Sequence, residues 1–414
     1  MVDVRLTLDH CVKCNICTTA CPVAAVTPLF PGPKYVGPQA ERFRLELEPM
    51  IAPEGSEAPS PDHSIDYCSG CGICSQVCPQ GVKIAEINTR ARAAYVGGQL
   101  PLRNQLIARP DLLGTLGTPF APIANATLSS QPLRGVVESV LGIHAEAPLP
   151  PFAGRTFQQW ASRHRRVRNA VRSVAYFHGC STNYYEPGLG ALTVQVLERN
   201  GCRVIVPRGQ TCCGLPLQSN GDFPAARAAA QRLVNTLLPY AEAGFDIVAT
   251  STSCGLMLKR EYIEILGLDA PEFKIVSERM WDICEYLWHL HEQGELQTDF
   301  RPVPLTMPYH APCQQKGHGI GKPALDLFGL IPGLRVAEMT SACCGIAGTY
   351  GLKKEKYQIA MDVGAPLFAE IRATGPDVAA CDSETCRWQI AHGSGVRTVH
   401  PIEVLAAAYG ICDM

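Results

Sequence analysis

The sequence predicts an α+β protein of several domains, in which a cysteine-rich N-terminal unit precedes two tandem α/β half-domains. Two C-x2-C-x2-C-x3-C runs lie within the first 100 residues, and a different cysteine pattern occurs twice in the C-terminal part. Short apolar runs alternate with helical patterns around that second pattern. The length of 414 residues suits two to three domains.

The N-terminal unit, residues 1–100, contains two cysteine runs that are each followed by proline, at Pro22 and Pro79. The residues between the runs are rich in proline and glycine, which predicts mostly loop. The cysteines of the two runs are Cys11, Cys14, Cys17, Cys21, Cys68, Cys71, Cys74 and Cys78.

This spacing is typical of bacterial ferredoxins. Three thiolates of a run bind one iron–sulfur cluster, and the fourth, before proline, ligates the other cluster. The sequence therefore predicts a helical, ferredoxin-like domain with two [4Fe–4S] clusters. The expected ligands are Cys11, Cys14, Cys17 and Cys78 for one cluster, and Cys68, Cys71, Cys74 and Cys21 for the other. Structural zinc is the alternative, but it more often uses two CxxC pairs.

A connector, residues 101–172, holds an uncharged stretch and then a basic one. Leu112–Leu133 has no charge but contains three prolines, so we interpret it as a buried or interfacial loop segment and not as a membrane span. Phe152–Arg172 has six arginines and no acidic residue, and its apolar residues recur every three or four positions. This pattern predicts a basic amphipathic helix on an anionic membrane surface. The alternative is a helix whose apolar side packs on the core.

The C-terminal part divides into two copies of one pattern, residues 173–300 and 301–414. Each copy has a single cysteine, an adjacent pair followed by glycine, and a further single cysteine that follows a serine by three positions. Two homologous half-domains explain this match. The cysteines are Cys180, Cys212, Cys213 and Cys254 in the first copy, and Cys313, Cys343, Cys344 and Cys386 in the second.

The repeat also predicts alternating strands and helices, and thus an α/β sheet in each half. Three helical patterns end just before a glycine, which is a typical helix stop. Ligands of such sheets gather at the carboxyl ends of strands, so we expect the cysteines of each half to converge. The expected strands are Val174–Phe177, Val204–Val206, Asp246–Thr250, Leu305–Tyr309, Leu334–Val336 and Asp377–Ala380. The expected helices are Leu189–Asn200, Ala225–Ala243 and Lys354–Thr374.

Adjacent cysteines before a glycine are hard to explain as packing, so we expect a metal centre on the four cysteines of each half. Cys381 is a candidate fifth ligand in the second half. The centre could be a further iron–sulfur cluster or zinc, and inert cysteines are the alternative. His178 and His310 precede a repeat cysteine and are candidates for a ligand or proton relay, or else hydrogen-bonded histidines at strand ends. Three isolated cysteines are interpreted as core residues: Cys202, Cys284 and Cys412.

The composition excludes several classes of protein. Hydrophobic residues make up 46% and charged residues 18%, as in folded globular chains, and a net charge of −2 does not indicate nucleic-acid binding. No signal-peptide pattern or transmembrane helix is expected, so the 20 cysteines should not form disulfides. No G-x-G-x-x-G follows a strand, which predicts no flavin or NAD site of its own. We assign no catalytic residue, so a partner must supply the electrons.

Long strings of the sequence resemble a family of iron–sulfur subunits of anaerobic glycerol-3-phosphate dehydrogenase. They run through the whole chain and include CVKCNICTTACPV, GTPFAPIAN, FHGCSTNYYEP, CCGLPL, CCGIAGTYGLKKEKY and ETCRWQI. More widely, the chain is similar to iron–sulfur proteins with the paired-cysteine (CCG) domain. These include subunits of glycolate and lactate oxidation and of heterodisulfide reductase.

The resemblance implies two CCG domains and the role of an electron-transfer subunit. Such a subunit receives electrons from a flavin-containing subunit that oxidises glycerol 3-phosphate. It passes them toward quinone as a peripheral protein on the cytoplasmic side of the cell membrane. An iron–sulfur subunit of a glycolate or lactate oxidase, or a heterodisulfide-reductase-like protein acting on thiols, is the alternative. The family's CCG pattern ends in CxxC, but Ser251 and Ser383 replace its first cysteine here, which argues against disulfide chemistry.

Overall fold

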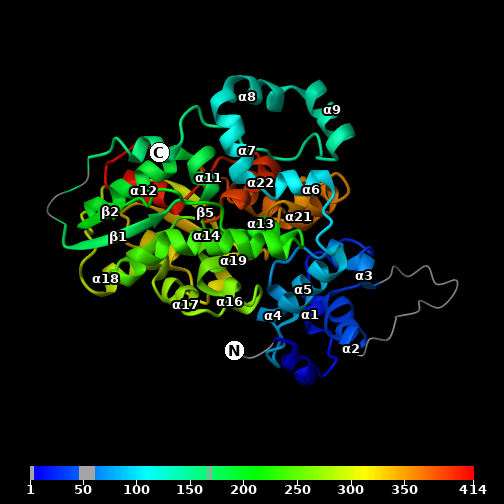
Figure 1. The fold of residues 1–414 in the computed structure, drawn as a ribbon. Coiled ribbons are helices and arrows are strands. Elements are labelled where there is room, and N and C mark those ends of the chain that lie inside the picture. The colour runs from blue at the N-terminus through cyan, green and yellow to red at the C-terminus, as the bar shows by residue number, and fades with distance from the viewer. Residues whose placement is uncertain (1–3, 46–60, 166, 168–169) are drawn as a thin grey trace.

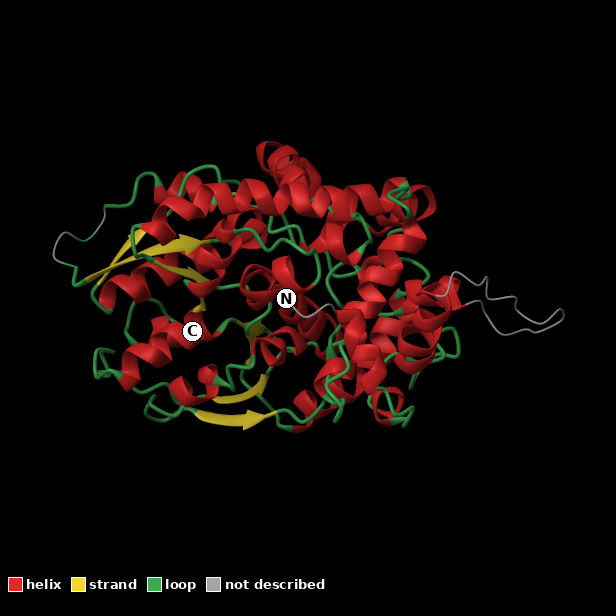
Figure 2. Ribbon diagram, turned by 60° about the horizontal axis from the view of Figure 1, so that its bottom comes forward, coloured by secondary structure: helices red, strands yellow, loops and turns green. Residues whose placement is uncertain are grey.

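The computed structural model describes residues 4–45, 61–165, 167 and 170–414. Within them the chain forms a helical N-terminal unit, a helical connector and two half-domains with one parallel sheet each (Figure 1). Figure 2 shows the two sheets standing apart, with helices between and around them. The predicted mixed architecture with two tandem α/β half-domains is confirmed.

Short helices make up the described part of the N-terminal unit. Helices α1 and α4 each begin between the second and third cysteine of a run, and they pack against each other. The expectation of mostly loop between the runs is wrong for residues 35–45 and 61–67. Pro61 opens α3, where a helix tolerates proline, whereas Pro38 lies inside η2 beside the non-helical Gly37. Residues 46–60 lie outside the described residues. The elements are η1 (Val4–His10), α1 (Ile16–Thr19), η2 (Tyr35–Gln39), α2 (Ala40–Leu45), α3 (Pro61–Ser64), η3 (Ile65–Tyr67), α4 (Ile73–Gln76) and α5 (Ile84–Val96).

The first half-domain is built on a parallel sheet with the strand order β2-β1-β3-β4. Its two central strands are almost entirely buried, as their apolar sequences predict. The strands are β1 (Arg172–Phe177), β2 (Cys202–Ile205), β3 (Asp246–Ala249) and β4 (Met280–Asp282). The helices are α11 (Gly179–Tyr184), α12 (Pro187–Arg199), α13 (Leu215–Ser219), α14 (Phe223–Glu242), α15 (Thr252–Leu256), η5 (Met257–Glu261), α16 (Tyr262–Glu264), α17 (Pro271–Glu278) and α18 (Ile283–Glu292).

The second half-domain repeats this topology with the strand order β6-β5-β7-β8. All six predicted strands and all three predicted helices are present within two or three residues of their expected ends. The edge strands β4 and β8 were not expected, because strands of three and two residues give no periodic pattern. The strands are β5 (Thr306–His310), β6 (Arg335–Glu338), β7 (Ala379–Cys381) and β8 (Thr398–Val399). The helices are α19 (Cys313–His318), α20 (Pro323–Phe328), η6 (Tyr350–Leu352), α21 (Tyr357–Ala373), α22 (Glu384–Ser394) and α23 (Pro401–Ala408).

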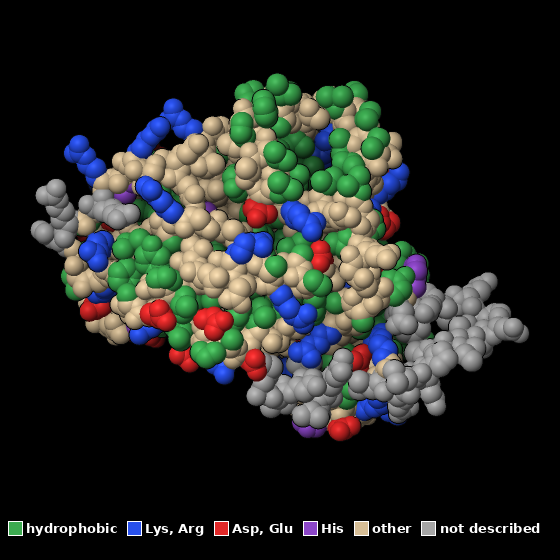
Figure 3. Space-filling model, viewed as in Figure 1, with side chains coloured by type: hydrophobic (Ala, Val, Ile, Leu, Met, Phe, Trp, Pro, Cys, Tyr) green, Lys and Arg blue, Asp and Glu red, His purple; other side chains and the backbone are tan. Residues whose placement is uncertain are grey.

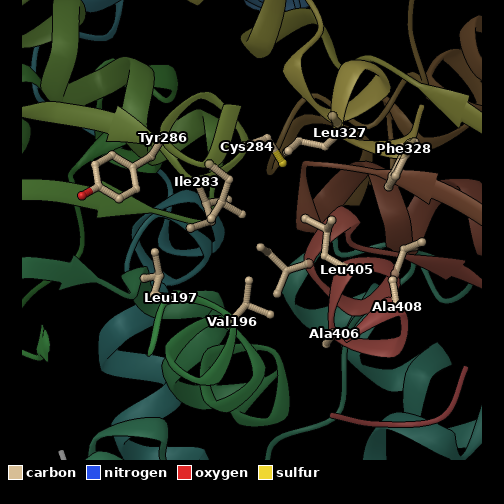
Figure 4. Packing of buried hydrophobic residues seen from close by; sticks show 14 of the residues in the cluster. Val196, Leu197, Ile283, Cys284, Tyr286, Leu327, Phe328, Leu405, Ala406 and Ala408 are labelled. Carbon is tan, nitrogen blue, oxygen red and sulfur yellow. The ribbon is translucent and has the colours of Figure 1, made fainter. Parts of the chain in front are cut away.

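The two half-domains share one hydrophobic core, shown in Figure 4. Helix α12 of the first half packs against α23 of the second, and α18 packs against α20. These helices occupy matching places in the repeat, so the halves meet about a pseudo-two-fold axis. The repeat boundary near residue 300 therefore does not divide the core. Side chains from all four helices meet there: Val196, Leu197, Ile283, Tyr286, Leu327, Phe328, Leu405 and Ala408.

Two buried histidines tie the halves together in their neutral form. His400 Nε2 donates to the carbonyl oxygen of Thr250 at 3.0 Å, and His318 Nε2 donates to that of Thr252 at 2.8 Å. Burial lowers the pKa of His400 to about 3 and that of His318 to about 4. Because these values lie below the usual histidine pKa of about 6.5, the unfolded chain binds more protons in mildly acidic solution.

We therefore expect acid to weaken the fold as the pH falls from about 6.5 toward 3. The contribution of neutral His400 to the free energy of unfolding is complete above about pH 6.5 and is lost progressively as the pH falls toward its folded-state pKa of about 3. At pH 5 the loss should reach about 2 kcal/mol for this residue. Urea unfolding at pH 7 and pH 5 measures it, and His400→Asn, which keeps a helix-capping side chain, should show the smaller fall. An equal fall in His400→Asn and in the exposed control His63→Asn would contradict this assignment.

The uncharged stretch Leu112–Leu133 is helical, and its interpretation as a loop segment is wrong. Its prolines stand in the first turn of their helices, where no backbone hydrogen bond is lost. No helix among the described residues is long and apolar enough to cross a bilayer. The connector helices are α6 (Leu102–Ile107), α7 (Pro110–Gly117), η4 (Thr118–Phe120), α8 (Ala121–Ser129), α9 (Gln131–Leu141) and α10 (Phe157–Ala161).

Helices α7 to α9 expose an apolar face, visible as hydrophobic side chains over α8 and α9 in Figure 3. Val140 is 75% exposed and Ile123 is 70% exposed. Soluble monomers seldom expose so contiguous an apolar patch without a binding role. We call this surface the apolar face; its residues are Leu112, Leu116, Phe120, Ile123, Leu133, Val136 and Val140.

The expected basic amphipathic helix within residues 152–172 is confined to α10 among the described residues. Its Phe157 is fully buried in the shared core and Trp160 packs against that core, so these aromatics cannot lie in a membrane. His164 pairs with Glu198 at 2.8 Å, beyond the end of the helix. The alternative, a short helix packed on the core, is thus the correct one. Residues 166, 168 and 169 lie outside the described part of the chain.

Candidate iron–sulfur centres

The structure gathers the cysteines of the N-terminal unit into two groups that mix the two runs. Burial raises the pKa of Cys17, and the nearby thiolates of Cys14, Cys11 and Cys78 raise it further. Cys78 of the second run thus lies with three cysteines of the first. Four converging thiols fit an iron–sulfur cluster.

The second group contains three cysteines of the second run and Cys21 of the first. Burial raises the pKa of Cys74 well above its usual range, with further contributions from Cys71, Cys68 and Cys21. Burial also raises the pKa of Cys21 to about 11, and among the thiolates Cys68 adds most to this shift, ahead of Cys17. Cys21 therefore lies with the second run, as crossed ligation requires.

Tight turns between the cysteines allow this convergence. Gly70 and Gly72 have positive φ angles of 69° and 81°, which glycine adopts without strain. In the first run Lys13 stands in the place of Gly70, and it also has a positive φ of 59°. The turn, and not the residue type, therefore imposes the left-handed conformation here.

In each half-domain the repeat cysteines converge at the carboxyl ends of the strands, as predicted. Cys180 follows β1 and Cys254 lies in α15, just after β3. Cys213 Sγ lies 3.5 Å from Cys254 Sγ. Hydrogen bonds from Cys180 and Cys213 lower the pKa of Cys212, which favours its thiolate form.

The second half-domain repeats this arrangement with one more thiol. Cys344 Sγ lies 3.0 Å from Cys386 Sγ, and hydrogen bonds from Cys313 and Cys344 lower the pKa of Cys343. Hydrogen bonds from Cys344 and Cys381 likewise lower the pKa of Cys386. Cys381 therefore belongs to this group of thiols, and the two halves differ in their donor sets. Sets of four and five thiols fit an iron–sulfur cluster or zinc.

A glycine after each cysteine pair closes the loop onto the sulfur. The backbone N–H of Gly214 donates to Cys212 Sγ at 3.5 Å, and that of Gly345 donates to Cys343 Sγ at 3.3 Å. Both glycines have φ near +90°. A side chain at Gly345 would place its Cβ 1.9 Å from the carbonyl oxygen of Ala360. Backbone geometry thus requires the glycine that follows each cysteine pair.

Ser251 and Ser383 stand where the family's pattern has a cysteine, and each lies at the N-cap of a helix. The Ser251 hydroxyl accepts the N–H of Cys254 at 3.3 Å and donates to Glu384 of the other half at 3.1 Å. Ser383 lies at the N-cap of α22. Ser251 therefore orients the cysteine that follows it and holds the two halves in register.

The two candidate histidines have different surroundings. His178 Nε2 bonds the Gln158 side chain at 3.1 Å, and His178 Nδ1 bonds the Gly179 carbonyl oxygen at 2.6 Å, so it is a hydrogen-bonded histidine at a strand end. Both ring nitrogens of His310 are buried and have no hydrogen-bond partner among the described residues. His310 lies near Cys386 and Cys343 and lines the cavity beside them, so it is the histidine that can contact a group bound there.

One cavity of about 620 Å³ joins the thiol groups of both half-domains. Its volume is in the range of small-molecule sites. Cys71 of the N-terminal unit and apolar side chains of the connector also line it. The lining cysteines are Cys71, Cys180, Cys212, Cys213, Cys254, Cys313, Cys343, Cys344 and Cys386. The apolar connector residues are Ile107, Pro110, Leu113, Leu128, Val137, Ile143, Leu149, Pro150 and Phe152.

Sequence reasoning missed that Cys71 and the second half-domain are neighbours. Burial, and next the thiolate of Cys343, raise the pKa of Cys71. Buried Lys356 holds the two parts together through an ion pair with Asp66. Burial raises the pKa of Asp66, but Lys356, together with Arg92 and Lys353, lowers it to about 2. No sequence pattern could have shown a contact between positions so far apart.

Comparisons with known proteins agree with this organisation. A family model for a 4Fe–4S dicluster domain matches residues 7–82, and one for a cysteine-rich domain matches residues 174–259 and 307–391. The chain is 38% identical to a subunit of the anaerobic glycerol-3-phosphate dehydrogenase of Escherichia coli (strain K12), over 97% of this chain and 98% of that protein. The predicted resemblance and iron–sulfur character are thereby confirmed.

More distant relatives have other roles. The chain is 25% identical to the glycolate oxidase iron–sulfur subunit of Escherichia coli (strain K12), over 97% of this chain and 94% of that protein. It is 22% identical to a subunit of the dihydromethanophenazine:CoB–CoM heterodisulfide reductase of Methanosarcina barkeri, over 98% of this chain and 94% of that protein. Proteins that match this chain over nearly its whole length thus carry names that refer to different substrates.

Proposed function

Because the chain belongs to the family of iron–sulfur subunits of anaerobic glycerol-3-phosphate dehydrogenase, we propose that it passes electrons from a flavin-containing partner subunit toward quinone. The chain is an iron–sulfur electron-transfer subunit. In the proposed complex the partner oxidises glycerol 3-phosphate. This chain lies peripherally on the cytoplasmic side of the cell membrane.

In this proposal two [4Fe–4S] clusters occupy the N-terminal unit, within residues 1–100. Such a cluster accepts and releases single electrons when bound. The thiols of each half-domain, 173–300 and 301–414, hold a further metal centre. The proposed cluster ligands are Cys11, Cys14, Cys17 and Cys78, and Cys21, Cys68, Cys71 and Cys74. The proposed half-domain ligands are Cys180, Cys212, Cys213 and Cys254, and Cys313, Cys343, Cys344, Cys381 and Cys386.

The observation that carries the proposal is the order of the thiol groups in space. Cys71 belongs to the second N-terminal group and lies beside Cys343 and Cys313 of the second half-domain. The first N-terminal group adjoins the second, because helix α1 packs against α4. The groups thus form a series that leads from the N-terminal unit to the shared cavity, which is what a relay of electrons requires.

The shared cavity supports a lipophilic acceptor at the end of this series. The connector residues that line it are apolar, and all but Ile107 of α6 belong to the helices whose outer surface is the apolar face or to the loop that follows them. A quinone combines an apolar tail with a ring that hydrogen bonds can orient. His310, with both ring nitrogens unpartnered among the described residues, can donate to such a ring.

The decisive experiment uses the native complex under anaerobic conditions. We expect glycerol 3-phosphate to bleach the broad visible absorption of the iron–sulfur protein, while glycolate and lactate leave it unchanged. Bleaching by another hydroxy acid would reject the glycerol 3-phosphate assignment and retain electron transfer. No response to any of these substrates, with clusters that dithionite still reduces, would instead favour a thiol or disulfide reductase.

We expect the apolar face to carry membrane binding, in place of the basic segment. Replacing Ile123 and Val140 together by glutamine should reduce co-flotation of the complex with vesicles of anionic lipid by at least about tenfold, because full burial of each side chain contributes about 1.5–3 kcal/mol. The matched control is Val171→Gln, which changes an 81% exposed valine outside this face. Equal flotation of both variants would show that this surface does not contact lipid.

A further inference from the structure

We propose that Asp282, Cys284 and Asp382 bind a zinc ion in the core between the two half-domains. One oxygen of each carboxylate and the Sγ atom of Cys284 lie within 4.8 Å of one another. Each of the three residues is at most 1% exposed. Asp282 and Cys284 belong to the start of α18 in the first half, whereas Asp382 follows β7 in the second. A cation here would join the two halves.

Each carboxylate is held through one oxygen and leaves the other oxygen available. Asp282 Oδ1 accepts the backbone N–H groups of Cys284 at 2.8 Å and Glu285 at 3.4 Å. Asp382 Oδ2 accepts the hydroxyl of Tyr309 at 2.6 Å. Hydrogen bonds of this kind orient the ligands of metal ions.

The other oxygen of each carboxylate indicates that a ligand binds here. Asp282 Oδ2 and Asp382 Oδ1 are buried and have no hydrogen-bond partner among the described residues. Two unsatisfied carboxylate oxygens beside a thiol are strongly unfavourable in a protein core unless a cation or protons neutralise them. A bound cation satisfies all three groups at once.

The sequence repeat provides an internal comparison. In the other copy, His400 and Ile402 occupy the positions of Asp282 and Cys284. Thr250 occupies the position of Asp382. There His400 Nε2 donates to the Thr250 carbonyl oxygen at 3.0 Å, and the hydroxyls of Tyr176 and Thr250 bond at 3.0 Å. Neutral groups therefore satisfy one another in this copy, and only the other copy has acquired two carboxylates and a thiol.

The donor set favours zinc over other divalent cations. Thiolate sulfur suits zinc and excludes magnesium and calcium, and zinc also accepts carboxylate oxygen. Ligand atoms on tetrahedral zinc lie about 3.5 Å apart, so small side-chain rotations would close the site. Binding releases the protons that the thiol and the carboxyl groups carry without the metal.

The test is metal analysis of the complex purified from zinc-supplemented cells. We expect about one zinc ion per chain, and a zinc-edge X-ray absorption spectrum with one sulfur and several oxygen neighbours. Asp282→Asn keeps a helix cap and Cys284→Ile copies the other repeat. Both variants should lose the zinc and keep the iron content of the wild type. Cys202→Ala, which changes an isolated buried cysteine of the same core, should keep both metals.

Three outcomes would overturn the proposal. The first is wild-type protein that binds no zinc, and the second is a Cys284→Ile variant whose zinc content per chain equals that of the wild type. The third is an all-sulfur spectrum, which would place zinc on the repeat cysteines instead. Should Asp282→Asn not fold, Cys284→Ile decides alone, since it replaces one buried side chain by the apolar one that the other repeat carries.

Discussion

Cys78→Ala is expected to abolish the same cluster signal as Cys14→Ala, although these cysteines lie in different runs. Cys21→Ala should instead abolish the signal that Cys71→Ala abolishes. The structure groups the four thiols in this crossed way. Each variant should lose about four irons, because a thiolate ligand of a [4Fe–4S] cluster is removed. Electron paramagnetic resonance of the reduced complex, together with iron analysis, measures both effects.

Electron transfer through the complex should fall by at least about a hundredfold in these variants, since a missing cluster interrupts the series of redox centres. Cys412→Ala, at an isolated cysteine near the C-terminus, should leave both signals intact. Loss of one common signal in Cys78→Ala and Cys71→Ala would contradict crossed ligation, because each run would then ligate its own cluster.

Gly345→Ala is expected to disrupt the second half-domain. Its Cβ would lie 1.9 Å from the Ala360 carbonyl oxygen, at a φ of +89° that alanine disfavours. Strain and overpacking together should lower the free energy of unfolding by about 3–5 kcal/mol. The thiol of Cys343 would also lose the N–H group of Gly345. Urea unfolding and metal analysis should show a less stable chain that retains the N-terminal clusters.

The repeat and an open turn supply graded controls for this variant. At Gly214 the added Cβ would lie 3.1 Å from the Ala226 carbonyl oxygen, so Gly214→Ala should be milder. Gly375 also has a positive φ, but no atom lies within 4 Å of an added Cβ. Gly375→Ala should therefore cost only the backbone strain of about 1–2 kcal/mol. Equal losses in all three variants would show that the clash with Ala360 does not decide the effect.

Some interpretations of local sequence were wrong for identifiable reasons. The prolines of Leu112–Leu133 suggested loop, but each stands in the first turn of a helix. The arginine-rich segment suggested a membrane helix, but Phe157 packs into the shared core. Apolar spacing identifies one side of a helix and cannot tell whether lipid or protein covers it.

The sequence alone predicted the cysteine groups, and it determined the two α/β half-domains and the family. These features depend on residue spacing and on repetition, which are properties of the linear sequence. Only the tertiary structure decided that Cys71 lies beside Cys343, that His310 differs from His178, and that Asp282 meets Asp382. Each of these facts joins elements that fold separately and meet only in the packed protein. Local patterns fix which side chains an element presents, whereas packing between elements fixes which of them become neighbours.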